Sequence, residues 1–286
     1  MALLDRELLE SVSPLFRGEK GRARAERVLH LLNVDKVEES YVPIAELDGI
    51  EAASEWLRLQ DVKSEIKGRE ILEHLPEGPF ITVSNHTIGT VDGMMLLSIL
   101  GEYRPDYKVL VNKFLGVFKS LESAFIEVTP TGEERTAPTA QSIKGIRRAM
   151  EHLRDGHPLG LFPAGAVSDL HPGRRPVVQM PDGSTHREPR IRDREWQMPM
   201  IRFIQKAGVP VVPIRVFDGN TRFFYDLGLI SWKIRVLRQP TELVNKAGRT
   251  LRFGVGEVIS PERIAACSDL EELRTLLRGA VYSQEF

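Results

Sequence analysis

The chain has 286 residues, of which 42% are hydrophobic and 28% charged, a composition typical of a globular protein and unlike that of a disordered or fibrous one. The formal net charge is −1, so no overall field attracts nucleic acid, and binding driven by global charge is excluded. Cys267 is the only cysteine, which excludes an intramolecular disulfide and a cysteine-based zinc site and fits a reducing compartment.

The N-terminal sequence indicates neither secretion nor a membrane span. "MALLDRELLESV" has acidic residues where a signal peptide would have a cationic end followed by an apolar run. No stretch approaches the ~18 uninterrupted apolar residues of a transmembrane helix. We therefore expect a cytoplasmic protein. If its substrate is a lipid, we expect peripheral association with the inner face of the cell membrane.

Residues 1–75 are predicted to form a helical region that packs on a catalytic domain. "GRARAERVLHLLNV" and "IEAASEWLRLQDV" both carry helical apolar spacing. From Pro79 onward, short apolar β-rich runs alternate with helical stretches. The predicted strands are 79–84, 107–111, 124–129, 158–162, 209–216 and 234–237.

Helices are predicted between and after these strands. Residues 138–156 carry one apolar stripe, and residues 268–280 begin with Ser268 and Glu271 in the relation of a capping box. Strands that alternate with helices indicate an α/β fold with a largely parallel sheet flanked by helices. We expect this domain to comprise residues 76–286.

The first candidate site is the join between strand and helix in "ITVSNHTIGTVDGMMLLSIL", residues 81–100. Working residues of open α/β sheets follow the carboxyl ends of strands, as His86 does. Asp92 lies six residues later, a separation that turns through roughly 600° on a regular helix, so the two side chains meet only across a non-helical turn. Gly89 would permit that turn.

In that turn Asp92 would accept a hydrogen bond from one ring nitrogen of His86. The other nitrogen could then take a proton from a hydroxyl or an amine. The alternative is that the two residues only cap the helix and satisfy each other, because aspartate is a common helix cap whatever the function.

The second candidate site is "PLGLFPAGAVSD", residues 158–169, where an apolar strand runs into a loop of small residues. Small residues let backbone amides approach a ligand, as an oxyanion or phosphate cradle requires. An ordinary strand-to-loop turn is the better explanation of this segment when it is taken alone.

The third candidate site is "GVPVVPIRVFDGNTRFFY", residues 208–225, a buried strand followed by a polar turn and an aromatic pair. A further candidate is the long polar segment 172–195, which is either functional or mobile. Its arginines are Arg174, Arg175, Arg187, Arg190, Arg192 and Arg194. Arginine forks bind phosphate or carboxylate. We expect most of them to pair with the segment's own carboxylates, Asp182, Glu188, Asp193 and Glu195. Arg192 and Arg194, inside "IRDREWQ", are the pair that we assign to substrate binding.

Three ordered motifs, "SNH…D", "FP-x-G-x-x-S" and "VPVVPI", resemble the glycerolipid acyltransferase superfamily typified by lysophosphatidate acyltransferases. Five residues separate His86 from Asp92 where four are usual. That spacing, with "FPAGAVSD", "IRDREWQ" and "FDGNTRFFYDL", is similar to the bacterial hemolysin-like branch, which includes enzymes that O-acylate lyso-amino-acid lipids. The resemblance runs from about Leu32 to Ile264.

The resemblance implies a lysolipid O-acyltransferase of membrane lipid synthesis. His86 would deprotonate the acceptor hydroxyl and Asp92 would orient it. The hydroxyl would attack a thioester on acyl carrier protein or coenzyme A, without an acyl-enzyme. We expect no metal and no tightly bound cofactor. The positions that the resemblance assigns to substrate binding are Asn85, Gly89, Phe162, Pro163, Gly165 and Ser168.

Two departures from the family pattern concern the acceptor. Ala164 and Val167 stand where the glycerophosphate branch usually has a glutamate and an arginine, and "SAFIEVTP" lacks another expected arginine. Because the resemblance credits both arginines with holding the acceptor's phosphate, we favour a lyso-amino-acid lipid over lysophosphatidate.

Two other functions remain open at this point: a thioester hydrolase in which His86 activates water, and a non-catalytic lipid-binding protein.

Contact with a membrane surface would need an interfacial segment. The apolar and basic residues within 1–24 could supply it, or they could pack on the catalytic domain. They are Leu3, Leu4, Leu8, Leu15, Phe16, Arg17, Lys20, Arg22 and Arg24.

Overall fold

The computed structural model describes residues 16–112, 119–128 and 140–286. Its centre is a seven-stranded sheet of order β1-β11-β10-β2-β5-β3-β4. The strands are β1 (Lys63–Lys67), β2 (Ile81–Ser84), β3 (Lys108–Asn112), β4 (Phe125–Val128), β5 (Leu159–Leu161), β10 (Val211–Val216) and β11 (Thr250–Val255). The five strands from β10 to β4 run parallel, and β11 and β1 run in the opposite direction. The expected α/β fold with a largely parallel sheet is confirmed.

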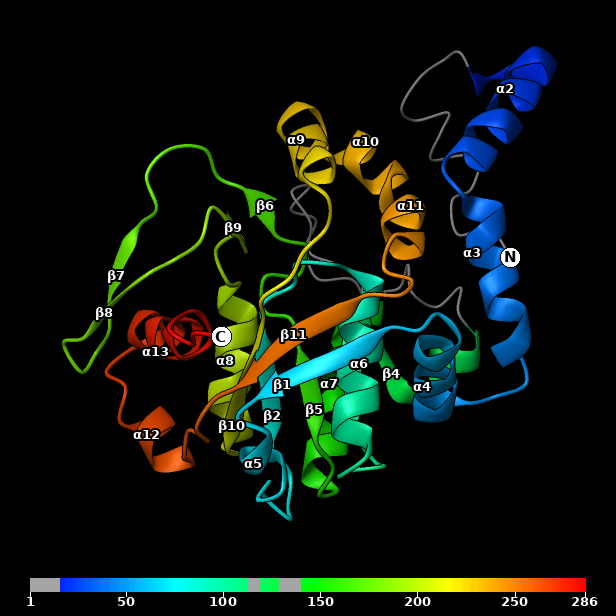
Figure 1. The fold of residues 1–286 in the computed structure, drawn as a ribbon. Helices are drawn as coiled ribbons and strands as arrows, with labels where there is room; N and C mark the ends of the chain where they lie inside the picture. The colour runs from blue at the N-terminus through cyan, green and yellow to red at the C-terminus, as the bar shows by residue number, and fades with distance from the viewer. Residues whose placement is uncertain (1–15, 113–118, 129–139) are drawn as a thin grey trace.

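Helices cover both faces of this sheet (Figure 1). The longer ones are α2 (Gly18–Leu31), α3 (Val34–Tyr41), α4 (Gly49–Leu59), α6 (Thr90–Gly101), α7 (Ala140–Arg154), α8 (Met198–Ala207), α9 (Arg222–Ile230) and α13 (Leu270–Tyr282). The short ones are η2 (Val42–Ile44), α5 (Arg69–Leu72), η4 (Lys119–Ala124), α10 (Trp232–Leu237), α11 (Gln239–Val244) and α12 (Pro261–Ala265). None of the described helices is both long and apolar enough to span a bilayer.

Strand side chains alternate between two cores, as the pleat of a strand requires. On β2, Ile81 and Val83 join the core shared with α7, α8 and α13. On β10, Val212 and Ile214 join the core shared with α3, α4 and α6. Helix α6 is buried along nearly its whole length, which explains why its sequence is apolar all round rather than on one stripe.

Five of the six predicted strands are present, but 234–237 lies in α10. The sequence missed β1 and β11. Strand β1, "KSEIK", is a charged edge strand, a common protection against edge-to-edge pairing, so its apolar signal is absent. The helical prediction for 1–75 was therefore wrong over 63–67, while the division of the chain at residue 75 stays a prediction.

The last helix is confirmed, but its cap was predicted one residue too early. Asp269 is the N-cap and accepts from the N–H of Glu272 at 2.8 Å. Ser268 instead donates to the Glu272 carboxylate. The described part of the N-terminal region packs on α10 and α11, where Ala25, Val34 and Leu237 form a small core with Phe16 against it. The four leucines that were considered either for membrane insertion or for packing on the catalytic domain, Leu3, Leu4, Leu8 and Leu15, lie outside the described residues.

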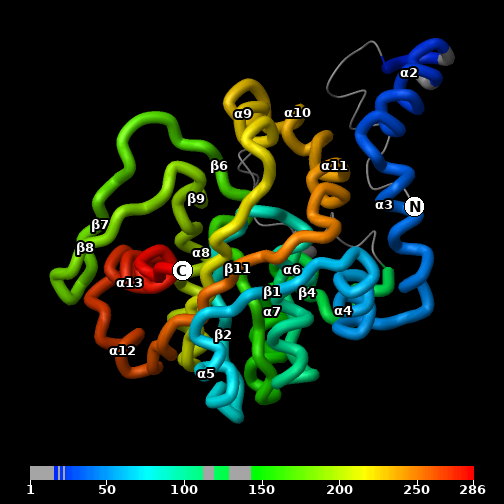
Figure 2. Tube along the Cα trace, viewed as in Figure 1, coloured from blue at the N-terminus to red at the C-terminus, as the bar shows by residue number. Residues whose placement is uncertain are grey.

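The polar segment 172–195 is not structureless. It forms the outer part of an arm that leaves the carboxyl edge of the sheet and returns beside α13 (Figure 2). The arm contains two small ribbons, β6 (Asp169–Leu170) with β9 (Ile191–Arg192) and β7 (Val177–Gln179) with β8 (Thr185–Arg187). It brings residues after β9 back to the edge where β2, β5 and β10 end.

Candidate active site

His86 lies just beyond the end of β2 and meets Asp92 across a turn, which we name the His–Asp turn (residues 86–92). The Nδ1 atom of His86 is 2.9 Å from Oδ2 of Asp92. The same oxygen accepts the backbone N–H groups of Ile88 at 2.8 Å and Gly89 at 3.1 Å. Since a carboxylate oxygen accepts, this contact places the proton of a neutral imidazole on Nδ1 and leaves Nε2 as its base.

Gly89 makes the turn possible. Its φ of 106° lies in a region that residues with a Cβ rarely adopt. A Cβ there would also collide with the side-chain amide of Gln239. Gly89 is the N-cap of α6 and Asp92 lies in that helix's first turn, where the free amides favour a carboxylate. The non-helical turn expected at Gly89 is thus present.

The ring of His86 is held on one face as well as at Nδ1. It stacks on Phe162, with ring centroids 4.2 Å apart and an interplanar angle of 27°. The side chain retains 17% exposure, whereas that of Asp92 is fully buried. No described residue forms a hydrogen bond with Nε2. Orientation by a carboxylate at one nitrogen with the other accessible is the arrangement of a general base.

The backbone of His86 is anchored by Asp193, which the sequence did not single out as a site residue. Its Oδ1 accepts the N–H of His86 at 3.0 Å and the hydroxyl of Ser168 at 2.6 Å. Its Oδ2 accepts the indole N–H of Trp196 at 2.9 Å. Burial raises the pKa of Asp193, and these hydrogen bonds lower it in part. The expectation that Asp193 pairs with an arginine was wrong.

The loop after β5 packs against the same residue, Asp193. The N–H of Ser168 donates to the carbonyl of His86 at 2.6 Å, and Ser168 is fully buried. Gly165, with φ of 68°, donates to the carbonyl of Phe162 at 2.9 Å. The carbonyl of Pro163 accepts from the N–H of Gln197 at 3.0 Å. The loop therefore lies against the His–Asp turn.

Two predicted substrate-binding side chains form hydrogen bonds with protein groups. The Ser168 hydroxyl faces Asp193. The Asn85 amide exchanges two hydrogen bonds with the backbone of Val216, at 2.9 and 2.7 Å, and so joins β2 to β10. Asn85 also lines a cavity of about 310 Å³ that includes Thr87 and Arg215. The contacts of these residues with a substrate stay predictions.

Arg192 and Arg194 both form ion pairs. Arg192 lies 3.3 Å from Glu188 and donates to the carbonyl of Pro189, and Arg194 pairs with Asp169. Successive side chains of an extended segment point to opposite sides. Asp193 therefore points toward His86, whereas its neighbours Arg192 and Arg194 point away from it. Arg192 thus pairs with a carboxylate of the segment although it is one of the two arginines that we assigned to substrate binding, and the substrate contact proposed for this pair stays a prediction.

The segment after β10 supports the His–Asp turn from behind. The Tyr225 hydroxyl donates to the carbonyl of Thr87 at 2.6 Å. The side-chain amides of Asn220 and Gln239 donate to the carbonyl of Ile88 at 2.9 and 3.0 Å. A turn whose carbonyls are fixed in this way holds its imidazole in one position, which catalysis requires.

Behind Asn220 lies a buried lysine. The ammonium of Lys246 donates to the Asn220 side chain at 2.9 Å and lies 3.9 Å from Glu242. Burial lowers the pKa of Lys246, and the Glu242 and Asp92 carboxylates raise it. The polar support of the turn thus extends from its carbonyls into the protein interior.

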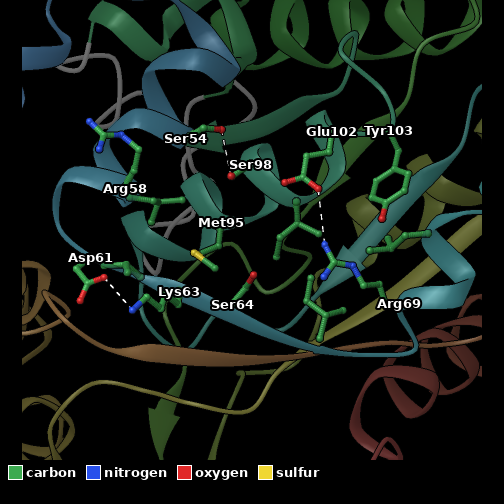
Figure 3. A pocket seen from close by; sticks show the side chains of 15 residues that line it. Ser54, Arg58, Asp61, Lys63, Ser64, Arg69, Met95, Ser98, Glu102 and Tyr103 are labelled. Carbon is green, nitrogen blue, oxygen red and sulfur yellow. Dashed lines mark hydrogen bonds and ion pairs between the residues drawn. The ribbon is translucent and has the colours of Figure 1, made fainter.

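A separate cavity of about 480 Å³ lies between α4, β1 and α6 (Figure 3). Four of its five charged side chains pair with one another, Lys63 with Asp61 at 3.1 Å and Arg69 with Glu102 at 3.8 Å. None of the predicted site residues lines it. In the described part of the chain, no cluster of three or more histidine, cysteine or carboxylate side chains could hold a metal.

A family model described as Acyltransferase matches residues 64–217, more than half of the chain. The chain belongs to the acyltransferase family. The matched range contains the His–Asp turn, the loop after β5 and Asp193. The resemblance on which the sequence interpretation rested is confirmed, and the protein is an acyltransferase enzyme.

Two relatives carry the name lyso-glycine lipid O-acyltransferase. The protein of Phocaeicola vulgatus is 30% identical over 221 residues, which are 74% of this chain and 69% of the relative. That of Bacteroides thetaiotaomicron is 29% identical over 222 residues, 74% of this chain and 71% of the relative. The crystal structure of the 1-acyl-sn-glycerophosphate acyltransferase of Thermotoga maritima is 18% identical, with a TM-score of 0.48 and coverage of 91% and 86% of the two chains.

Proposed function

We propose that this acyltransferase moves a fatty acyl group from a thioester to the hydroxyl of a lyso-amino-acid lipid, with His86 as the base. The observation that carries the proposal is the fixed imidazole. Asp92 holds Nδ1 and Phe162 supports one face, while no described residue occupies Nε2. An accessible base at the carboxyl edge of a sheet suits proton abstraction from a bound alcohol.

The proposed reaction proceeds in two steps. Nε2 takes the proton from the acceptor hydroxyl as its oxygen bonds to the thioester carbonyl carbon, which gives a tetrahedral oxyanion. This intermediate collapses with cleavage of the carbon–sulfur bond, and the imidazolium returns the proton to the departing thiolate. The ester and a free thiol are the products. The buried carboxylate of Asp92 stabilises the imidazolium that forms between the two steps.

The acceptor assignment rests on two observations. Both named relatives are lyso-glycine lipid O-acyltransferases. In addition, the loop after β5 has Ala164 and Val167 where the glycerophosphate branch has charged residues. We therefore place a lyso-glycine lipid ahead of lysophosphatidate. The donor is the thioester of acyl carrier protein or coenzyme A, no tightly bound cofactor takes part, and the site of action is the inner face of the cytoplasmic membrane, where such acceptors reside.

The test uses the purified full chain with acyl carrier protein and coenzyme A thioesters, each against lyso-glycine lipid and lysophosphatidate. We expect the diacylated glycine lipid as the product, with a higher kcat/KM than for lysophosphatidate. His86→Ala should abolish its formation. Release of free fatty acid without acceptor acylation would identify a hydrolase, and preference for lysophosphatidate would reverse the acceptor assignment.

A further inference from the structure

Four large apolar side chains are exposed in the ten-residue stretch 223–232, which belongs to α9 and α10. Phe223 is 55% exposed, Leu229 54%, Ile230 75% and Trp232 46%. We name these four residues the apolar ridge. Phe223 and Ile230 lie seven positions apart, so they share one face of α9, whereas their neighbours Phe224 and Tyr225 are buried. Exposed apolar clusters of this kind mark interaction sites.

Basic residues lie at the rim of the ridge. The Lys233 ammonium is 5.8 Å from the centre of the Trp232 ring, and the Arg238 guanidinium is 5.3 Å from that of Phe223. Basic side chains beside aromatic rings are typical of segments at a lipid–water interface.

The pairing of the charges argues for a bilayer rather than an acidic protein as the occupant. Arg222 pairs with Asp226 at 2.8 Å, and Arg238 lies 3.5 Å from Glu242. An acidic carrier protein would be attracted by several unpaired cations, whereas two of the three basic residues named at the ridge, Arg222 and Arg238, are paired. Insertion of apolar side chains among lipid headgroups needs only a weakly basic rim, because burial of apolar area provides most of the binding.

The helix that carries part of the apolar ridge, α9, also contacts the His–Asp turn. Tyr225, on the buried face of the same helix, donates to the carbonyl of Thr87 in the His–Asp turn. Figure 1 shows α9 and α10 beyond the carboxyl edge of the sheet, the edge at which His86 lies. A bilayer that covers α9 and α10 would therefore bring its headgroups close to that edge.

We propose that the apolar ridge is the surface by which the enzyme docks on a bilayer, with Phe223, Ile230 and Trp232 inserted at headgroup level. The inference rests on the proposed function in one respect, that the acceptor resides in the membrane. It differs from the expectation for residues 1–24, because it assigns docking to helices that follow β10.

The chain offers an internal probe of this contact. It has three tryptophans, of which Trp56 and Trp196 are buried, so a change in emission on vesicle binding reports Trp232. With vesicles of phosphatidylethanolamine and phosphatidylglycerol, we expect a blue shift and quenching by lipids labelled at a shallow depth. Vesicle-bound protein with unshifted, unquenched emission would overturn the proposal.

The test variant is the triple substitution Phe223→Ser/Ile230→Ser/Trp232→Ser. We expect the fraction of protein that sediments with vesicles to fall at least tenfold. The rate of acylation of a detergent-dispersed, short-chain lyso-glycine lipid should stay within twofold of the wild-type rate. The control is Val42→Ser/Ile143→Ser/Val177→Ser, which removes three similarly exposed side chains from other elements and should bind vesicles as the wild type does.

The outcomes separate the two proposals. If the ridge variant sediments with vesicles as strongly as the wild type, docking through the ridge is refuted while the proposed function stands. If the ridge instead binds acyl carrier protein and not vesicles, the membrane assignment is wrong. If the wild type fails to acylate the dispersed lyso-glycine lipid, the acceptor assignment fails whatever the vesicle result.

Discussion

The backbone N–H of His86 donates to the carboxylate of Asp193, a residue 107 positions later in the chain, at 3.0 Å. The same carboxylate accepts from Ser168 and Trp196. One buried side chain thus ties the end of β2, the loop after β5 and the entry to α8. Since all three donors need an acceptor, only a carboxylate satisfies them together.

We predict that Asp193→Asn lowers kcat by about 10- to 100-fold and destabilises the protein by about 1–3 kcal/mol, the usual cost of a buried hydrogen bond left unmade. The new amide N–H₂ must face either Trp196 or the Ser168 and His86 donors, which displaces the backbone of His86. Steady-state kinetics and urea unfolding measure the two effects. Asp182→Asn is the control, because Asp182 bonds only to exposed Ser184 groups among the described residues. An unchanged kcat in Asp193→Asn would contradict the anchoring role.

Gly89→Ala should lower both stability and activity. Its φ of 106° strains any L-residue, a cost of about 1–3 kcal/mol, and the added Cβ meets Gln239, which would push the turn from Asp92. Gly248→Ala is the matched control, since φ is 71° there but the Cβ enters open space. We expect the control to lose stability and keep kcat in the same kinetic and urea measurements. Equal kcat values for the two variants would show that the turn tolerates the shift.

Five strands of the sheet and the His–Asp turn could be predicted because their signals are local. Strands buried on both faces are continuous apolar runs, and β2, β3, β4, β5 and β10 all have that pattern. The segment 234–237 has it as well, yet it forms part of α10. Over four residues a buried strand and a half-buried helix have the same composition, and only length separates them.

Asp193 could not be predicted because its role is defined by tertiary contacts. In the sequence it lies in a segment that contains six arginines, so pairing with one of them was the expectation. The arm, which contains two ribbons, brings it to His86 across 107 positions of the chain. The alternation of an extended segment is the one local signal that separates Asp193 from its neighbours, because residues next to each other point to opposite sides.

Asp92→Asn distinguishes a catalytic carboxylate from a helix cap. Asparagine keeps an oxygen that can accept from Ile88, Gly89 and His86, but it removes the charge that stabilises an imidazolium. We expect kcat to fall about 100-fold or more, in line with loss of general-base function, with a small change in unfolding temperature. Asp269→Asn, at the N-cap of α13, is the control and should leave kcat unchanged. Similar kcat values for both variants would favour the capping explanation.

The buried lysine behind the turn predicts a dependence of stability on pH. Burial lowers the pKa of Lys246 in the folded protein, although the Glu242 and Asp92 carboxylates oppose the shift. The unfolded chain, in which a lysine titrates near 10.4, therefore binds more protons in the window between the two pKa values. In that window the free energy of unfolding rises with pH, because the cost of burying the ammonium disappears as it deprotonates.

Lys246→Met removes this contribution and the hydrogen bond to Asn220. The free energy of unfolding of the wild type minus that of the variant should rise from pH 7.5 to pH 10, as measured by urea unfolding at constant ionic strength. Because Asn220 also donates to the carbonyl of Ile88, the variant should lose part of kcat at every pH as the turn loosens. A stability difference that stays constant across the range would show that Lys246 remains charged in the folded protein throughout.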